Sequence, residues 1–405
     1  DERDVELTVI GSFTGDHRLT LCYGERVVGS LEMDFLHDGI PRRRLTAEWG
    51  TGDRRIGDLG NSAGAFADLG ELGEVLRNLL GSPNIASKEA VIRRYDHEVQ
   101  GATVVKPLTG VLDDGPSDAA VLRPLELQLH PRPGAADGSY RGLALGCGLN
   151  PGYGRLDPYA MAWAAIDEAL RNVVAVGADP DQVALLDNFC WGNPNLPDRL
   201  GDLVRAAQGC RDAALHYGAP FVSGKDSLNN EYVDADGVKT PIPPTLLISA
   251  LGFVPDVRQA VTMDLKAAGS RLYLLGETRD ELGASALAAT YGLAGGQTPA
   301  PMPASFETMR RLHRAICAGH VRACHDCSEG GLAVAAAEMA FAGGIGLELR
   351  LADVPLAADV PAEPATRDVY ALFAETSGRF LVEVAEADAA RFEAELAAVA
   401  GLPWA

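Results

Sequence analysis

Ala219–Glu231 (APFVSGKDSLNNE) joins a short apolar run to a run of small and charged residues. The apolar part is typical of a strand, and the part that follows is typical of a polar loop. Gly224 allows backbone N–H groups to approach a ligand, Lys225 adds a mobile cation, and Ser227 adds a hydroxyl. The spacing is not that of a P-loop. The stretch therefore indicates a phosphate-handling loop after a strand, with an ordinary polar turn as the alternative.

The residues before this stretch predict a crossover unit. Val183–Leu186 is apolar and typical of a strand that ends at Asp187, and residues 201–218 have helical spacing. Strand, helix and strand in this order predict two parallel strands, with Asp187 and Gly224 at neighbouring strand ends, where α/β proteins bind ligands. The alternative for Asp187 is a helix cap.

A long helix is predicted from Pro158 to Val174. Asp157 is a suitable N-cap, Pro158 suits the first helical position, and the Ala-rich sequence favours helix. Glu168 and Asn172 are four residues apart and share one face. A carboxylate and an amide oxygen at this spacing can both ligate Mg²⁺, although a solvated polar stripe is the alternative.

A second α/β domain is predicted from Arg271 onward, with strands near residues 272–276, 347–351 and 380–384. Residues 325–332 (HDCSEGGL) precede an apolar helix, and Ser328 is a candidate for its N-cap. A helix N-terminus flanked by glycines favours anions, and Asp326 could hold the accompanying metal ion.

Composition restricts the possible functions. The 405 residues carry a formal net charge of -21, which disfavours binding of nucleic acid or an anionic membrane through the surface as a whole. An odd number of cysteines, seven, without framework spacing suits a reducing cytosol, so we expect a cytoplasmic protein. No segment approaches the apolar length of a membrane-spanning helix. The fold class predicted is α/β (α+β), with mixed sheets flanked by helices.

The first hundred residues contain fewer patterns that indicate a structure or a function. Residues 5–13 and 19–33 read as two strands separated by a hairpin-like turn. Residues 41–100 read as a connector with helical spacing at 69–80 and at 84–100. A new unit is expected to begin at about residue 101.

Four motifs occur in one order along the chain: NPGYGRLDPY at 150–159, WGNP at 191–194, SGKDS at 223–227 and HDCSEGGL at 325–332. Together they resemble the synthetase part of the phosphoribosylformylglycinamidine synthases, within the superfamily of aminoimidazole ribonucleotide synthetase. That family has two tandem pairs of A and B domains. The resemblance implies the tail of a first B domain (1–40), a connector (41–100), a second A domain (101–257) and a truncated second B domain (258–405).

The resemblance implies one group of residues at the active site. Asp187 and Gly224 match positions that contact ATP, and Ser227 matches a position that contacts the ribonucleotide. Lys225 stands where small-type members have an Asn that ligates Mg²⁺; lysine cannot do so, and we expect it to contact a phosphate of ATP. The catalytic histidine of the family lies in a Ser-Glu-His-Cys motif, which this sequence lacks.

A second group matches an auxiliary nucleotide site, which holds ATP or ADP with Mg²⁺ in large-type members. The resemblance places two serines on the nucleotide and four oxygen donors around the ion: Ser117 and Ser328, then Asp118, Glu168, Asn172 and Asp326.

The implied reaction is ATP-dependent amidation of formylglycinamide ribonucleotide. A glutaminase subunit or domain would supply ammonia, and the N-terminal half of the enzyme would supply the missing histidine. One alternative is another ATP-dependent member of the superfamily, such as aminoimidazole ribonucleotide or selenophosphate synthetase. The other is a non-catalytic nucleotide-binding lobe that serves as a scaffold.

Overall fold

The computed structural model describes residues 6–50, 66, 69–95, 97–126, 139–399 and 401–405. The chain divides into two compact units, Asp1–Thr46 and Ala47–Ala405. The first unit contains strands β1 (Arg18–Tyr23) and β2 (Arg26–Glu32), which pair antiparallel, and helix α1 (Met33–Asp38). The predicted run 19–33 is therefore a hairpin that turns at Gly24, whose φ is +60°. The strand predicted at 5–13 is wrong for its described residues, 6–13, which have no regular structure.

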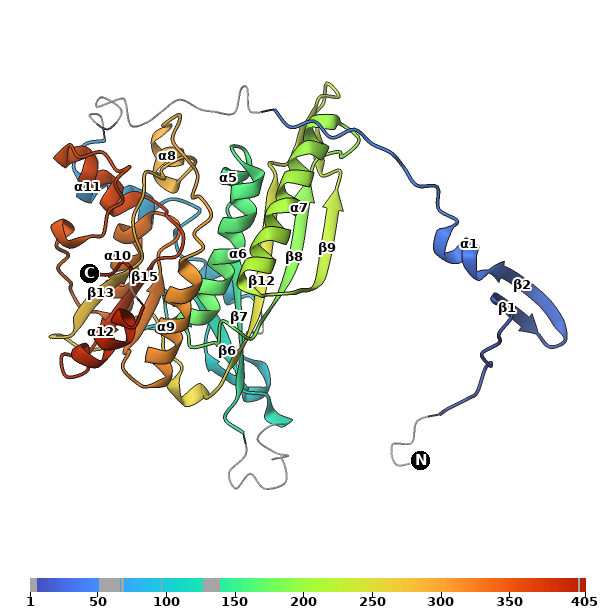
Figure 1. The fold of residues 1–405 in the computed structure, drawn as a ribbon, viewed down its shortest axis with the longest axis horizontal. Coiled ribbons are helices and arrows are strands. Elements are labelled where there is room, and N and C mark those ends of the chain that lie inside the picture. The colour runs from blue at the N-terminus through green and yellow to red at the C-terminus, as the bar shows by residue number, and fades with distance from the viewer. Residues whose placement is uncertain (1–5, 51–65, 67–68, 96, 127–138, 400) are drawn as a thin grey trace. The chain divides into compact units, whose positions relative to one another are not determined.

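A six-stranded mixed sheet lies on one side of the second unit, with β9 at its outer edge (Figure 1). Only β8 and β9 are parallel, and the crossover through helix α7 that connects them was predicted from the sequence. In spatial order the strands are β3 (Thr103–Val105), β6 (Ala119–Leu122), β7 (Gly142–Gly148), β12 (Thr245–Val254), β8 (Val183–Trp191) and β9 (Phe221–Leu228).

Strands β8 and β9 are longer than predicted. The residues expected to form a loop at 223–227 continue β9, and Asp187 lies within β8 rather than at its end. In the parallel register Asp187 is opposite Gly224, and pairing runs on to Trp191 and Leu228. Ladder hydrogen bonds from β8 thus override the weak strand propensity of Ser, Gly, Lys and Asp.

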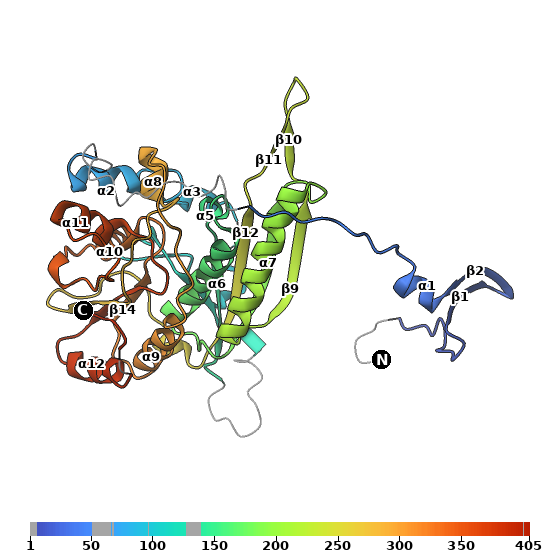
Figure 2. The ribbon, with the colours of Figure 1, turned by 45° about the horizontal axis from the view of Figure 1, so that its top comes forward.

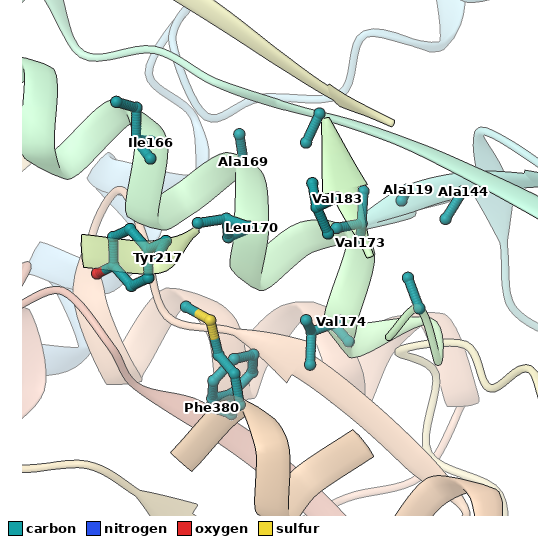
Figure 3. Close-up of a cluster of buried hydrophobic side chains, with 14 of the residues drawn as sticks. Ala119, Ala144, Ile166, Ala169, Leu170, Val173, Val174, Val183, Tyr217 and Phe380 are labelled. Atoms are coloured by element: carbon teal, nitrogen blue, oxygen red, sulfur yellow. The ribbon is translucent and has the colours of Figure 1, made fainter. Parts of the chain in front are cut away.

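Helix α6 (Pro158–Ala175) packs on one face of the sheet, and α7 (Pro197–Tyr217) packs beside it. Asp157 caps α6 as predicted, because its carboxylate accepts from the backbone N–H groups of residues 159 and 160. Leu170, Val173 and Val174 pack into a core that also includes Phe380 of the second domain (Figure 3). Helix α6 therefore lies between the two sheets.

The smaller sheet is three-stranded and antiparallel, in the order β13 (Arg271–Leu275), β15 (Phe380–Val384), β14 (Ala323–Asp326). The strand predicted at 347–351 is wrong: residues 344–350 have no regular structure, and Leu351–Asp353 is a 3-10 turn. The helices of this second domain are α8 (Ala286–Tyr291), α9 (Ser305–Cys317), α10 (Gly331–Gly343), α11 (Pro364–Phe373) and α12 (Ala389–Ala397).

Helix α10 does not use Ser328 as its cap, contrary to the prediction. Its N-cap is Gly330, in a left-handed conformation with φ +79°, and the Ser328 hydroxyl instead donates to Asp326. Position 330 requires glycine, because a Cβ atom there would overlap the side chain of Val334 in the first turn of the helix.

Part of the predicted connector is packed onto the second domain. Helix α2 (Leu72–Leu80) buries Val75 and Leu79 in a cluster with Leu287 and Val334, and it lies beside α8 (Figure 2). The helix predicted at 84–100 is mostly wrong, since among the described residues of this range only α3 (Glu89–Ile92) and a 3-10 turn at Val99–Gly101 form. Exposed Val91 and Tyr95 show why: this segment has no apolar stripe that its surroundings bury.

The remaining elements are small: α5 (Pro151–Gly154), the pair β4 (Leu108–Thr109) and β5 (Gly115–Pro116), the pair β10 (Glu231–Val233) and β11 (Lys239–Pro241), and a 3-10 turn at Val257–Gln259. Among the described residues, no helix combines the length and the apolar character needed to span a membrane.

Candidate functional site

A buried carboxylate, Asp118, joins the two domains. Asp118 lies between β5 and β6, and its Oδ1 atom accepts from the backbone N–H of Asp326, at the end of β14, at 2.9 Å. The same oxygen is 2.9 Å from Nδ1 of His325. The other oxygen, Oδ2, is buried and has no hydrogen-bond partner in the structure. The Asp118 carboxylate thus contacts residues more than 200 positions away in the sequence, and one of its oxygens can still accept a hydrogen bond or bind a cation.

Asp326 is held from the opposite side by Arg171 of helix α6. Nη2 of Arg171 lies 3.3 Å from Oδ2 of Asp326 and donates to the Ser328 hydroxyl at 2.9 Å, while Nη1 pairs with Asp167. Sequence reasoning missed Arg171, although its spacing of four residues from Asp167 on a predicted helix was a usable signal. This buried arginine offsets part of the negative charge and fixes the orientation of Asp326.

A cavity of about 150 Å³ opens beside these residues. Acids and small polar groups supply most of its lining: Asn84, Glu168, His325, Asp326, Ser328 and Glu329. The N-terminal end of α10 follows directly after the last of them. Anions are favoured at such a helix end, so the cavity combines oxygen donors for a cation with a place for a phosphate.

The acids of the cavity raise one another's pKa values. Burial raises the pKa of Glu168 well above its usual range, and the charges of Glu329 and Asp326 add to the effect. Burial, followed by the charge of Glu375, raises the pKa of Glu329 to about 7. One oxygen of Glu168 accepts from the backbone N–H of Leu149 at 2.9 Å, which fixes the side chain at the cavity wall. A cation bound among these groups would relieve their mutual repulsion.

The donor set fits Mg²⁺. Hard oxygen ligands are what this ion prefers, and the unpartnered Oδ2 of Asp118 is a buried acceptor that a cation would satisfy. His325 completes a group with Asp118 and Asp326 whose possible ligand atoms all lie within 4.8 Å of one another. Of the four expected ligands, Glu168 and Asp326 line the cavity, whereas Asp118 lies outside the lining and reaches the site through its contact with Asp326.

Two expected residues are placed differently. Asn172 donates its side-chain N–H to the carbonyl of Cys147 at 2.7 Å and is not part of the cavity lining, so only its amide oxygen could serve a ligand. Ser117 donates to the carbonyl of Ala119 at 2.9 Å and also lies outside the lining. Ser328, by contrast, is part of the wall.

The second predicted group lies on β8 and β9. A Cβ on Gly224 would overlap the Asp187 carboxylate, so glycine at this position makes room for a side chain on the neighbouring strand. Burial, with the charge of Asp226, raises the pKa of Asp187. Asp187 in turn contributes, after burial, to raising the pKa of Cys210 on α7 to about 12. The Asp187 carboxylate therefore faces the helix-covered side of the sheet.

Lys225 and Ser227 alternate with Gly224 along β9 and face the opposite side, away from α7. The ammonium of Lys225 donates to the Ser227 hydroxyl. In the described part of the chain Lys225 forms no ion pair with Asp187 or Asp226. The four residues expected to converge are thus divided between two faces of one sheet.

Comparison with known proteins identifies two matched domains in the chain. The pattern of the AIR synthase related protein N-terminal domain matches residues 117–254, and that of the C-terminal domain matches residues 267–404. The chain belongs to the AIR synthase related family. The two matched regions contain the two sheets, and Asp118 and Asp326 come from different AIR synthase related domains.

Curated relatives in this family are similar over nearly the whole chain. The phosphoribosylformylglycinamidine synthase subunit PurL of Deinococcus radiodurans is 37% identical over 99% of this chain and 50% of its own length. The subunit from Synechococcus elongatus is 37% identical over 90% of this chain and 43% of its own. The chain therefore spans about half the length of the curated relatives it matches.

Solved structures share the fold. The structure described as T. maritima PurL complexed with FGAR superposes with a TM-score of 0.58 at 17% identity, covering 82% of this chain and 48% of the other. The same protein complexed with ADP gives 0.53 at 18% identity, over 96% of this chain and 48% of the other. At this identity the likeness concerns the fold alone.

Proposed function

We propose that this chain is the second half of the synthetase of a phosphoribosylformylglycinamidine synthase. Its enzyme would convert formylglycinamide ribonucleotide, ammonia and ATP into formylglycinamidine ribonucleotide, ADP and phosphate in purine biosynthesis. The observation that carries the proposal is 37% identity to PurL over 99% of the chain. A cytoplasmic location and a glutaminase partner that supplies ammonia belong to the same proposal.

Asp118, Glu168 and Asp326 would hold Mg²⁺ at an auxiliary nucleotide site. The ion would neutralise charge on the phosphates of a bound ATP or ADP. Ser328, already oriented by Arg171, would contact the nucleotide, and the N-terminus of α10 would face its phosphates. Ser117 and Asn172 would join the site only after their present hydrogen bonds to carbonyl groups are exchanged.

The residues on β8 and β9 would contribute to the catalytic site. Lys225 and Ser227 lie on the face of the sheet opposite α7, where the ammonium could meet a phosphate of ATP and the hydroxyl could meet the ribonucleotide. Asp187 and Gly224 face the other side, so their expected contact with ATP requires a ligand at the edge of the sheet or movement of β9. Activation of an amide oxygen by phosphoryl transfer then depends on cationic groups placed around the transferred phosphate.

A partner half of the enzyme would complete this catalytic site. Apolar residues on the side of the sheet away from α6 and α7 are exposed, with Leu145 at 45% and Phe253 at 44%, and Val222 on the edge strand is 62% exposed. An apolar sheet face of this kind is normally covered by another layer. The missing Ser-Glu-His-Cys motif agrees with an N-terminal half that provides both the cover and the histidine.

The test measures ammonia-dependent formation of the amidine product with ATP and Mg²⁺. We expect no turnover by the 405-residue chain alone and turnover after addition of an N-terminal half from a PurL relative. Turnover by the chain alone would contradict the proposal. Mg-ADP binding without turnover in either condition would favour the non-catalytic scaffold, and a product only from another superfamily substrate would favour that enzyme.

The auxiliary site has a separate test. Glu168→Gln should weaken Mg-ADP binding in calorimetry by about tenfold, because one charged ligand is lost. Glu348→Gln, at an exposed glutamate outside the cavity, is the matched control. Equal affinity of wild type and Glu168→Gln would remove this residue from the site.

A further inference from the structure

We propose that His325 is a positioning residue of the nucleotide-binding cavity, which directs the free oxygen of Asp118 toward a bound Mg²⁺ and does not itself ligate the ion. The inference deepens the proposed function and rests on the auxiliary site described there. It starts from an imidazole ring between two carboxylates, contributed by different parts of the fold.

Both nitrogens of the His325 ring are occupied. Nδ1 lies 2.9 Å from Oδ1 of Asp118, and Nε2 lies 3.1 Å from Oε2 of Glu338 on helix α10. Each ring nitrogen thus has a carboxylate oxygen within hydrogen-bond distance. The His325 side chain is 9% exposed, and those of Asp118 and Glu338 are 1% and 15% exposed. The ring therefore links the beginning of β6 to α10 across the domain boundary.

This arrangement fixes which Asp118 oxygen is available. Oδ1 is taken by the His325 ring and by the backbone N–H of Asp326. Oδ2 is the atom left without a partner in a buried position. A carboxylate held by two donors on one oxygen can rotate little, so the other oxygen keeps one direction. Ion binding then needs no reorientation of this ligand.

A metal-ligand role for His325 requires a different geometry. A ligating imidazole presents a ring nitrogen without a proton to the metal, and here each nitrogen faces a carboxylate oxygen. Mg²⁺ also prefers oxygen donors to imidazole. His325 thus holds Asp118 in place, as Arg171 holds Asp326 from the side of α6.

The test uses the 405-residue chain with His325→Leu and His325→Gln. Leu removes both hydrogen bonds, whereas the amide of Gln can still donate one to Asp118. His320→Leu changes a partly buried histidine outside the cavity and serves as control. Calorimetry measures the Kd of ADP with Mg²⁺ and with EDTA, Mn²⁺ binding is followed by water proton relaxation, and the melting temperature is recorded without ligand.

We expect His325→Leu to raise the Kd of Mg-ADP and of Mn²⁺ by about 10- to 100-fold, the range found when a hydrogen-bond partner of a metal ligand is removed. His325→Gln should lose less Mg-ADP affinity, and ADP affinity in EDTA should stay within about twofold of wild type for both variants. A purely structural role also lowers the melting temperature, so the ratio of the ADP affinities with and without Mg²⁺ is the deciding quantity.

Four outcomes would overturn the inference. An unchanged Mg-ADP affinity in His325→Leu excludes positioning, and an equal loss with and without Mg²⁺ indicates a general structural role. Loss of Mn²⁺ binding while the Mg²⁺ dependence of ADP affinity stays intact would make His325 a ligand. Absence of both Mg-ADP and Mn²⁺ binding in the wild type would instead reject the auxiliary site itself, and this inference with it.

Discussion

Glu329 is the residue whose replacement tests the electrostatics of the cavity most directly. Its pKa is raised from 4.5 to about 7, first by burial and then by the charge of Glu375. Asn84 donates to Glu329 at 3.3 Å, which compensates only in part. Glu329→Gln keeps the shape and removes the charge. We expect this variant to be more stable than wild type at high pH.

The sign follows from the raised pKa. Below pH 4.5 the carboxyl group is protonated in both the folded and the unfolded chain, so it imposes no electrostatic cost on folding. As the pH rises from 4.5 to about 7, the unfolded chain loses this proton while the folded chain keeps it, so stability falls across this interval and stays at its lower value above pH 7. A rise from 4.5 to about 7 corresponds to about 3 kcal/mol at 1.36 kcal/mol per pKa unit. Glu329 is only partly buried by area, and water entry reduces the effect, so we expect a gain of about 1 to 3 kcal/mol at pH 8.

Urea unfolding at pH 5 and pH 8 measures this difference, with exposed Glu348→Gln as control. The stabilisation by Glu329→Gln should be small at pH 5 and large at pH 8, and the control should show neither. Equal stabilisation at both pH values would refute the reasoning, since a packing effect does not depend on pH. A destabilised variant at pH 8 would show that the ionised carboxylate is held by partners.

Three further substitutions test other parts of the structure. Lys225→Met, tested together with the proposed N-terminal half, should weaken ATP binding or slow phosphoryl transfer by about ten- to hundred-fold. The reason is that a charge-assisted hydrogen bond is worth about 1.5 to 3 kcal/mol. Normal kinetics per folded molecule together with a lower Tm would contradict a contact between Lys225 and phosphate. Gly224→Ala should destabilise by about 1 to 3 kcal/mol through overlap with Asp187, and adding Asp187→Ala should restore most of the loss in a double-mutant cycle. Leu79→Ala should cost about 2 to 5 kcal/mol in urea unfolding if α2 is part of the second domain, whereas an effect near zero would show that the helix detaches.

The long helices and the central strands could be predicted from the sequence, because capping residues, hydrophobic spacing and the order of elements all indicate the same structure there. Asp157 and Pro158 mark the start of α6, and the crossover from β8 through α7 to β9 follows from element order. The ends of β8 and β9 could not be predicted from the sequence. Their polar residues are in strands because of hydrogen bonds to the neighbouring strand, and local propensity does not include these bonds.

The candidate site was predictable in its residue types but not in its geometry. Asp118, Glu168 and Asp326 were expected from a family resemblance, and the contact between the first and the last depends on packing of the two domains against α6. The roles of Arg171 and His325 depend on that same packing. Sequence alone could not show that Gly330, rather than Ser328, caps α10, because both residues are acceptable caps.

Helix α2 has a practical consequence for expressing this protein in parts. A cut near residue 100, where the sequence first looks like a new domain, would remove Val75 and Leu79 and leave their apolar partners Leu287 and Val334 facing water. It would also remove Asn84 from the wall of the 150 Å³ cavity. A recombinant piece that keeps this packing and this wall intact must therefore start upstream of Leu69.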